Sequence, residues 1–151
     1  MPRIMKFIYP PLIALLLGFI AFPATAAEEV TLFDRYGVAV AYIDSGDLTI
    51  YLLNGEPVAY LRRENESRFS AFGYNGRHLG WYLNGIVYGH DGDAVCAIAD
   101  RLNTTHEPTP HSRRQFVRIK APTEPVPPVP TFFNTFSAAP CDDVLEAGAS
   151  R

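Results

Sequence analysis

The stretch LLNGEPVAYL, residues 52–61, has a close counterpart in YNGRHLGWYL, residues 74–83. In each stretch, an Asn-Gly pair is followed by an aliphatic residue, a small residue and an aromatic residue in direct succession. Asn-Gly pairs between apolar segments are typical of tight hairpin turns, because Asn and Gly reach positive φ at low cost. The two stretches therefore predict two β-hairpins of the same kind.

The same pattern occurs four times, aligned on Gly37, Gly55, Gly76 and Gly92. Four residues before each glycine lies an aromatic residue: Phe33, Tyr51, Phe72 and Tyr88. Three residues after each glycine lies an aliphatic residue: Val40, Val58, Leu79 and Val95. The next position is small: Ala41, Ala59, Gly80 and Cys96. Coincidence is the alternative, but self-similarity at a short period is the usual mark of a repeat. Residues 30–100 are therefore predicted to form a four-hairpin domain.

The turn residues predict how the strands pair. Three glycines lie in dipeptides that favour two-residue type I′ turns: Asn54-Gly55, Asn75-Gly76 and Asp91-Gly92. Such turns would place Tyr51 opposite Val58 and Phe72 opposite Leu79, which are stabilising cross-strand pairs. The first unit, around Gly37, is better suited to a longer turn with glycine in the left-handed conformation.

Both faces of the predicted hairpins are apolar. Successive side chains of a strand point to opposite faces, and one face carries the aromatic and aliphatic columns with Tyr42, Tyr60 and Trp81. The other face carries the small column and the following residues: Leu32, Ile50, Ala71, Val87, Ile43, Leu61, Tyr82 and Ile98. Such a sheet must be covered on both sides or curl around an axis. We expect an all-β fold in which the hairpins form a shallow pseudo-four-fold barrel.

The units TLFDRYGVAVAYID, TIYLLNGEPVAYL, FGYNGRHLGWYL and VYGHDGDAVCAI resemble the four-fold β-flower proteins, small bacterial domains of four hairpin petals around a shallow barrel. YNGRHLGW and HDGD are the most specific part, and TFFNTFSAAPCDDVL is similar to the ending of many members. The resemblance implies no established activity, and the likeness of the barrel to the lipid-binding Tubby-type barrel concerns the fold alone. The N-terminal segment and the cysteines depart from the family pattern, so the resemblance does not imply a cytoplasmic location.

Residues 1–26 are typical of a secretory signal peptide. Arg3 and Lys6 precede the apolar segment LIALLLGFIAF, and PATA offers a cleavage site before Ala27. We expect an exported protein, periplasmic or secreted. The alternative is an uncleaved N-terminal anchor, although the apolar segment is shorter than the ~20 residues that span a bilayer. The net charge of −3 for 151 residues gives no basic footprint for nucleic acid.

A proline-rich strap or linker is predicted over residues 101–130. Residues 103–130 contain seven of the 13 prolines, and EPVPPVP favours an extended polyproline conformation. Residues 113–120, RRQFVRIK, could add an edge strand whose basic face consists of Arg113, Arg114, Arg118 and Lys120. That face could contact anionic lipid head groups, or be a solvated edge that its charge protects from aggregation.

An aromatic tail is predicted over residues 131–151, with a short helix from Pro140 to Ala147. Proline suits the first turn of a helix, and Asp142 and Asp143 lie near its positive end. The apolar residues that would dock the tail on the barrel are Phe132, Phe133, Phe136, Val144 and Leu145. The docked tail could plug the barrel or leave a channel open.

Cys96 and Cys141 are the two cysteines of the chain. Export to an oxidising compartment, together with docking of the tail, would allow a disulfide between them. Alternatively, Cys96 occupies the small column only because of its size.

The sequence contains no motif that is typical of an enzyme active site. His78, His90, His106 and His111 lack metal-ligand spacing. HDGD places His90, Asp91 and Asp93 at a turn, where Asp and Gly are common because they favour turn conformations of the backbone. No nucleophile motif or phosphate-binding loop is present. We therefore expect no enzyme activity, cofactor or metal.

Two classes of function stay open. The first is a non-enzymatic envelope protein, a binding or structural module that meets a lipid, a membrane surface or a protein partner. Its candidate ligand-binding residues are Tyr42, Tyr60, Trp81, Arg113, Arg114, Arg118 and Lys120, although large aromatic residues are mostly buried for packing, which favours a core role for the aromatic ones. The second is a small hydrolase or metal-dependent enzyme that uses the His and Asp residues at the turns.

Overall fold

The computed structural model describes residues 28–102 and 110–149. The predicted signal peptide at residues 1–26 lies outside the described residues, as does His106.

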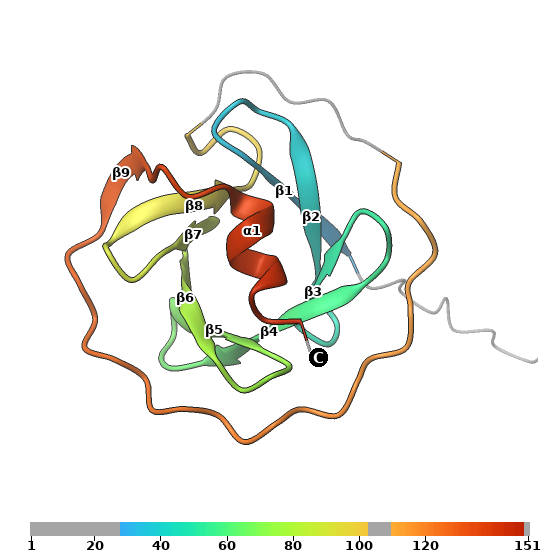
Figure 1. Ribbon diagram of the computed structural model, residues 1–151. Helices are drawn as coiled ribbons and strands as arrows, with labels where there is room; N and C mark the ends of the chain where they lie inside the picture. Colours follow the sequence, from blue (N-terminus) through green and yellow to red (C-terminus); the bar gives the residue numbers. More distant parts are fainter. Residues whose placement is uncertain (1–27, 103–109, 150–151) are drawn as a thin grey trace, which may run out of the picture.

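Eight antiparallel strands follow one another around a ring, and the ring closes because β1 pairs with both β2 and β8 (Figure 1). The strands are β1 Glu29–Phe33, β2 Ala39–Asp44, β3 Thr49–Leu52, β4 Pro57–Arg63, β5 Arg68–Gly73, β6 His78–Leu83, β7 Ile86–Tyr88 and β8 Asp93–Ala97. They form four consecutive hairpins. The predicted all-β barrel of four hairpins is confirmed.

Three hairpin turns, around Gly55, Gly76 and Gly92, differ from the predicted type I′ geometry, whereas Gly37 in the first turn has the predicted left-handed conformation, with a φ of 75°. Gly55 has a φ of 85°, but Asn54 before it is not at positive φ. In the other three hairpins, too, the glycine has a positive φ and the residue before it does not. The N–H of Gly55 donates to the carbonyl of Leu52, and the N–H of Leu52 donates to the carbonyl of Glu56. This is a three-residue loop with glycine in a left-handed bulge. The side chain of Asn54 accepts the N–H of Glu56 at 2.9 Å, which gives asparagine a reason to precede the glycine.

A second irregularity changes which side chains face the interior. Tyr51 pairs with Pro57 and Phe72 with His78, so the predicted partners Val58 and Leu79 are wrong. The register shifts at the corresponding place in all four hairpins. Because the extra residue interrupts the alternation of side chains, the aliphatic column leaves the aromatic face. Val58 and Leu79 are buried in the interior instead.

Helix α1 (Cys141–Glu146) lies over the centre of the ring of strands (Figure 1). Leu145 is fully buried there, and Cys141 is almost fully buried. They belong to one apolar cluster with Leu32, Ala41, Ile43, Ile50, Leu52, Val58, Ala59, Leu61, Ala71, Leu79, Val87, Val95 and Cys96. The predicted helix and the docking of the tail are confirmed, but Phe133, one of the predicted docking residues, is half exposed. Side chains of the helix fill the centre, whereas Phe132 and Phe136 pack against a separate cluster that includes Tyr88.

Residues 110–132 form a strap that runs around the outside of the barrel (Figure 1). The N–H groups of Gln115, Glu124 and Phe133 donate, each at 2.9 Å, to the carbonyls of three turn glycines: Gly55, Gly76 and Gly92. These donors are spaced nine residues apart, so the strap repeats the same contact at successive hairpins. A Cβ at Gly76 would collide with the carbonyl oxygen of Pro122, and the other two glycines face the strap in the same way.

The edge strand that was considered for residues 113–120 is not formed. Instead, backbone hydrogen bonds at both ends of this segment hold it to hairpin turns of the barrel. The N–H of Ser112 donates to the carbonyl of Leu53 at 2.7 Å, and the N–H of Ala121 donates to the carbonyl of Tyr74 at 2.8 Å. The strap joins the sheet only further on, where β9 (Phe133–Phe136) pairs in parallel with β8.

Candidate functional site: the strap and the groove beside His90

The aromatic residues Tyr42, Tyr60 and Trp81 lie on the outer face of the barrel and are buried. Residues of the strap contact each of them. The ring of His111 stacks on Tyr42 with 4.1 Å between centroids, and Nζ of Lys120 lies 3.9 Å from the centre of the Tyr60 ring. Phe132 packs edge-on against Trp81 at 5.9 Å. In this structure, therefore, the strap covers the predicted aromatic binding residues.

Arg114 anchors the strap at its beginning. Its guanidinium lies 5.6 Å from the ring centre of Tyr42 and 5.2 Å from that of Tyr51, and it forms ion pairs with Asp44 and Glu29. Burial acts to raise the pKa of the Glu29 carboxyl, but hydrogen bonds from His111 and Arg114 and their charges outweigh it and lower the pKa. The charge of Arg114 is therefore already partnered within the fold.

Three exposed apolar side chains lie between the basic residues of the strap: Phe116, Ile119 and Val117, of which Val117 is 45% exposed. Phe116 is 98% exposed and Ile119 is 94% exposed. Arg113 and Lys120 flank them and are also exposed. The guanidinium of Arg118 forms an ion pair with Glu56, with 3.8 Å between Nη2 and Oε1. The charges of this segment are its conspicuous feature in the sequence, and Phe116 and Ile119 were not among the predicted binding residues, although they lie three residues apart within QFVRIK.

His78 and His90 lack metal-ligand spacing in the sequence, but their rings lie in contact. Nδ1 of His78 is 2.8 Å from Nε2 of His90, and Nε2 of His78 is 3.2 Å from Oγ of Ser70. Ser70 donates to the carboxylate of Glu64, which also accepts from Nε of Arg68 at 2.8 Å. Burial, and next the neighbouring His90, lower the pKa of His78 to about 4. His78 is therefore neutral at physiological pH.

A shallow groove of about 250 Å³ opens beside His90. It is lined by Trp81, His90, Glu124, Pro125, Pro127 and Pro128. Oε1 of Glu124 accepts the backbone N–H of His78 at 2.7 Å, so the strap and β6 are fixed to each other at the groove. Trp81 packs edge-on against the rings of His78 and His90. The groove thus combines hydrogen-bond acceptors with apolar walls.

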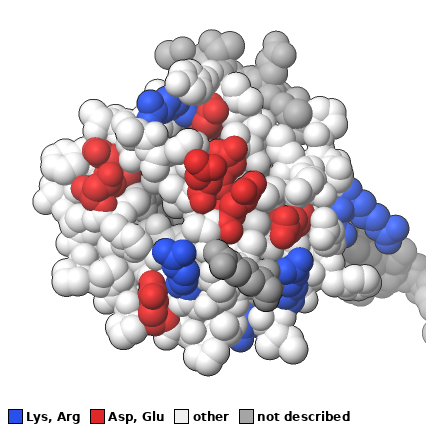
Figure 2. Space-filling model, viewed as in Figure 1, with Lys and Arg blue, Asp and Glu red and all other residues white. Residues whose placement is uncertain are grey.

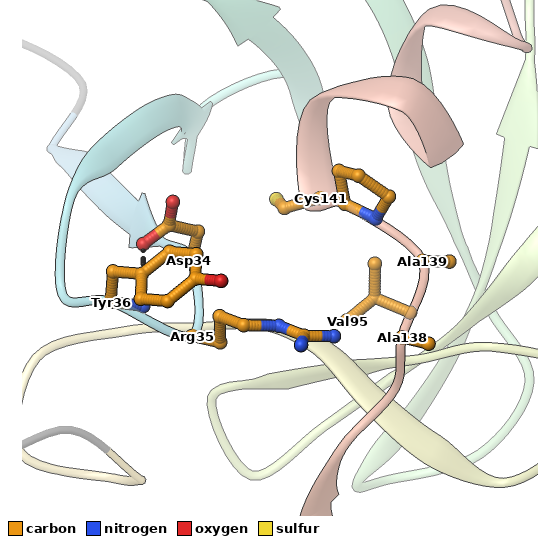
Figure 3. Close-up of a pocket in the computed structure, with 8 residues that line it drawn as sticks. Asp34, Arg35, Tyr36, Val95, Ala138, Ala139 and Cys141 are labelled. Carbon is orange, nitrogen blue, oxygen red and sulfur yellow. Dashed lines mark hydrogen bonds between the residues drawn. The ribbon is translucent and has the colours of Figure 1, made fainter.

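A second cavity, of about 120 Å³, lies between the first hairpin turn and the start of the tail helix (Figure 3). Its lining is Asp34, Arg35, Tyr36, Val95, Ala138, Ala139, Pro140 and Cys141. Arg35 reaches across it and donates to the carbonyl of Ser137. The side chain of Asp34 accepts the N–H groups of Tyr36 and Val38, so its carboxylate shapes the turn.

The face of the barrel that carries α1 is acidic at its centre (Figure 2). Asp142, Asp143 and Glu146 are exposed on the outer side of the helix. In the described part of the chain, no three metal-binding side chains converge on one point. Within the same residues, no helix has the length and apolar character needed to cross a membrane.

Asp91 and Asp93, which the enzyme alternative would use, have structural partners. Oδ1 of Asp91 accepts the N–H of Asp93 at 3.1 Å, and Oδ1 of Asp93 accepts the hydroxyl of Thr135 at 2.8 Å. Ser70, the hydroxyl nearest to the histidine pair, is fully buried. It is out of reach of a substrate in this structure.

The disulfide predicted between Cys96 and Cys141 is formed, and it ties β8 to α1. Stable disulfides are typical of oxidising compartments. The bond therefore points to an extracytoplasmic location.

These features define a class of protein: a closed barrel of four hairpins with a helix at its centre and a strap around its outside. Residues 30–145 match the 4-fold beta flower protein family, and the chain belongs to this family. The resemblance seen in the repeated units is therefore confirmed. No curated protein and no solved structure matches the chain.

Proposed function

We propose that this β-flower domain is a non-enzymatic, extracytoplasmic module that docks on a membrane surface through its strap. The observation that carries the proposal is the pair Phe116 and Ile119, which are almost fully exposed and stand between basic residues. Exposed apolar groups beside Lys and Arg are the usual composition of interfacial membrane contacts.

The strap presents these side chains in a fixed position. Hydrogen bonds from Ser112 and Ala121 to the barrel hold the segment at both ends. A pre-ordered segment loses little conformational entropy on binding. Transfer of Phe116 and Ile119 from water to the acyl boundary would contribute about 2 kcal/mol each. Arg113 and Lys120 would add ~1 kcal/mol each on an anionic surface.

The outer surface supports this role better than the barrel interior does. Leu145 and Cys141 occupy the centre with the interior cluster, so an acyl chain would have to displace the helix and its disulfide. A surface contact requires no such opening.

The proposal is tested by co-sedimentation of the mature chain with phosphatidylcholine vesicles that contain phosphatidylglycerol. The double variant Phe116→Ser/Ile119→Ser should bind at least about tenfold more weakly, because it loses most of the apolar transfer energy. Val38→Ser is the matched control, since Val38 is a half-exposed apolar residue at the tip of the first hairpin. Equal binding of wild type and double variant, or no binding of wild type, would overturn the proposal and direct the search to a protein partner.

We also propose that the chain is exported and cleaved near Ala27, as its N-terminal sequence predicts. The disulfide supports an oxidising destination. The intact mass of the protein recovered from the cell envelope should correspond to a chain that lacks residues 1–26. A mass that includes those residues would indicate an uncleaved anchor instead.

A further inference from the structure

A chain of hydrogen bonds runs from Glu64 through Ser70 and His78 to His90. The partners along this chain fix the position of each of its protons. The carboxylate of Glu64 accepts hydrogen bonds from Arg68 and Ser70; burial acts to raise its pKa, but these bonds and the charge of Arg68 lower it. Glu64 is therefore ionised and can only accept. The single hydroxyl proton of Ser70 must then point to Glu64, which leaves Oγ of Ser70 as an acceptor.

The same logic sets the tautomers of the two histidines. Because Oγ of Ser70 can only accept from His78, the proton of neutral His78 lies on Nε2. Nδ1 of His78 is then a lone pair, and the contact of 2.8 Å requires Nε2 of His90 to donate. In the uncharged form of the ring, Nδ1 of His90 is consequently an acceptor to which no described residue donates. Ionised Glu64 thus orients the acceptor of an exposed imidazole three hydrogen bonds away.

The groove beside His90 presents acceptors to whatever enters it. Its polar lining residues are His90 and Glu124, and its remaining walls are three prolines and Trp81, whose indole N–H is buried and has no partner among the described residues. No Lys or Arg side chain is among the lining residues. Such a site repels anions and favours a ligand that donates hydrogen bonds, carries positive charge and has an apolar stem.

We propose that the groove beside His90 is a binding site for a protonated amine on a short apolar stem. His90 and Glu124 accept hydrogen bonds from the ammonium group, and Pro125, Pro127 and Pro128 pack along the stem. The volume of about 250 Å³ suits a small amine or the end of a lysine side chain, not a larger ligand.

The test uses n-butylammonium as the probe and the mature, oxidised protein, followed by ¹⁵N shifts of the His90 ring and the Trp81 indole. A probe of this size should bind with a Kd on the order of millimolar. Glu124→Gln keeps the acceptor for His78 but removes the charge, and it should weaken binding about tenfold. 1-Butanol and butyrate, with the same stem, should bind far more weakly.

Two results would overturn the proposal. One is equal affinity for n-butylammonium and 1-butanol, or unchanged affinity in Glu124→Gln and His90→Ala, which would make the groove merely apolar. The other is a His90 ring whose proton lies on Nδ1 at neutral pH in a long-range ¹H–¹⁵N spectrum. That spectrum reads the tautomer directly, and so it tests the hydrogen-bond chain even if a variant fails to fold.

Discussion

His78 is the residue through which mild acid is expected to act on the fold. Its pKa is lowered from 6.5 to about 4 by burial first and by His90 next, against the opposing charges of Glu64 and Glu124. Between these two pH values the unfolded chain binds a proton at this residue and the folded chain does not. Stability should therefore fall as the pH drops from 6.5 to about 4, by at most about 3 kcal/mol from this residue.

The measurement is urea unfolding of the wild type and of His78→Gln between pH 7 and pH 4. The difference in unfolding free energy between the two proteins should narrow as the pH falls, because glutamine does not titrate. A constant difference over this range would mean that His78 takes up its proton equally in both states.

At the scale of single residues, the sequence predicted positions better than conformations. The glycines of the four hairpins were located correctly because each has a positive φ, which glycine adopts at the lowest cost, and at Gly55, Gly76 and Gly92 the strap also leaves no room for a Cβ. The type I′ geometry was wrong because an Asn-Gly pair fits either a two-residue turn or a bulged loop. Asn84-Gly85 does have both residues at positive φ, and it links β6 to β7. The His78–His90 contact could not be predicted, since it depends on the register shift that places His78 opposite Phe72.

At the scale of elements, the disulfide is expected to hold the helix in the barrel. It joins Cys96 of β8 to Cys141 at the first turn of α1, 45 residues apart in the chain. A crosslink that closes a loop of this length contributes about 4 kcal/mol in the chain-entropy model. Reduction, or Cys96→Ala/Cys141→Ala, should lower the unfolding free energy by roughly that amount.

The bond itself is checked by alkylation of unreduced, denatured protein, which should label no thiol in the mature chain. Two labelled thiols would contradict the disulfide. The reduced protein should nevertheless keep the far-ultraviolet spectrum of a β-barrel, because the strand pairing around the ring does not depend on the crosslink.

Among the elements, the hairpins and the short helix were predictable because their signals are local. The path of the strap was not, because its hydrogen bonds go to distant turns, and an alternating segment such as residues 113–120 resembles an edge strand in sequence. The predicted membrane role of its basic residues stays a prediction. Arg114, one of these residues, binds Asp44 and Glu29 within the fold.

At the scale of the whole molecule, the tail is expected to be part of the core. Deletion of residues 131–151 would remove β9, the buried Leu145 and the disulfide together. Loss of one buried leucine costs about 2–5 kcal/mol and loss of the crosslink about 4 kcal/mol. Together these approach the entire stability of a typical domain, which is about 5–15 kcal/mol.

The truncated chain should therefore show no cooperative thermal unfolding in near-ultraviolet circular dichroism, whereas a chain that ends at Ala149 should behave as the full length does. If the truncated chain stayed folded and took up a fatty acid, the helix would be a removable plug, and the barrel interior would be a lipid site after all.

The nine-residue spacing of the strap has a consequence for how such proteins can change in length. Nine residues of fully extended chain span at most about 30 Å, which sets the upper limit on the path of the strap from one turn glycine to the next. A single inserted residue would shift every later N–H of the strap away from the turn-glycine carbonyl to which it donates. Viable insertions and deletions between Gln115 and Phe133 should therefore come in units of nine, each accompanied by the gain or loss of a complete hairpin.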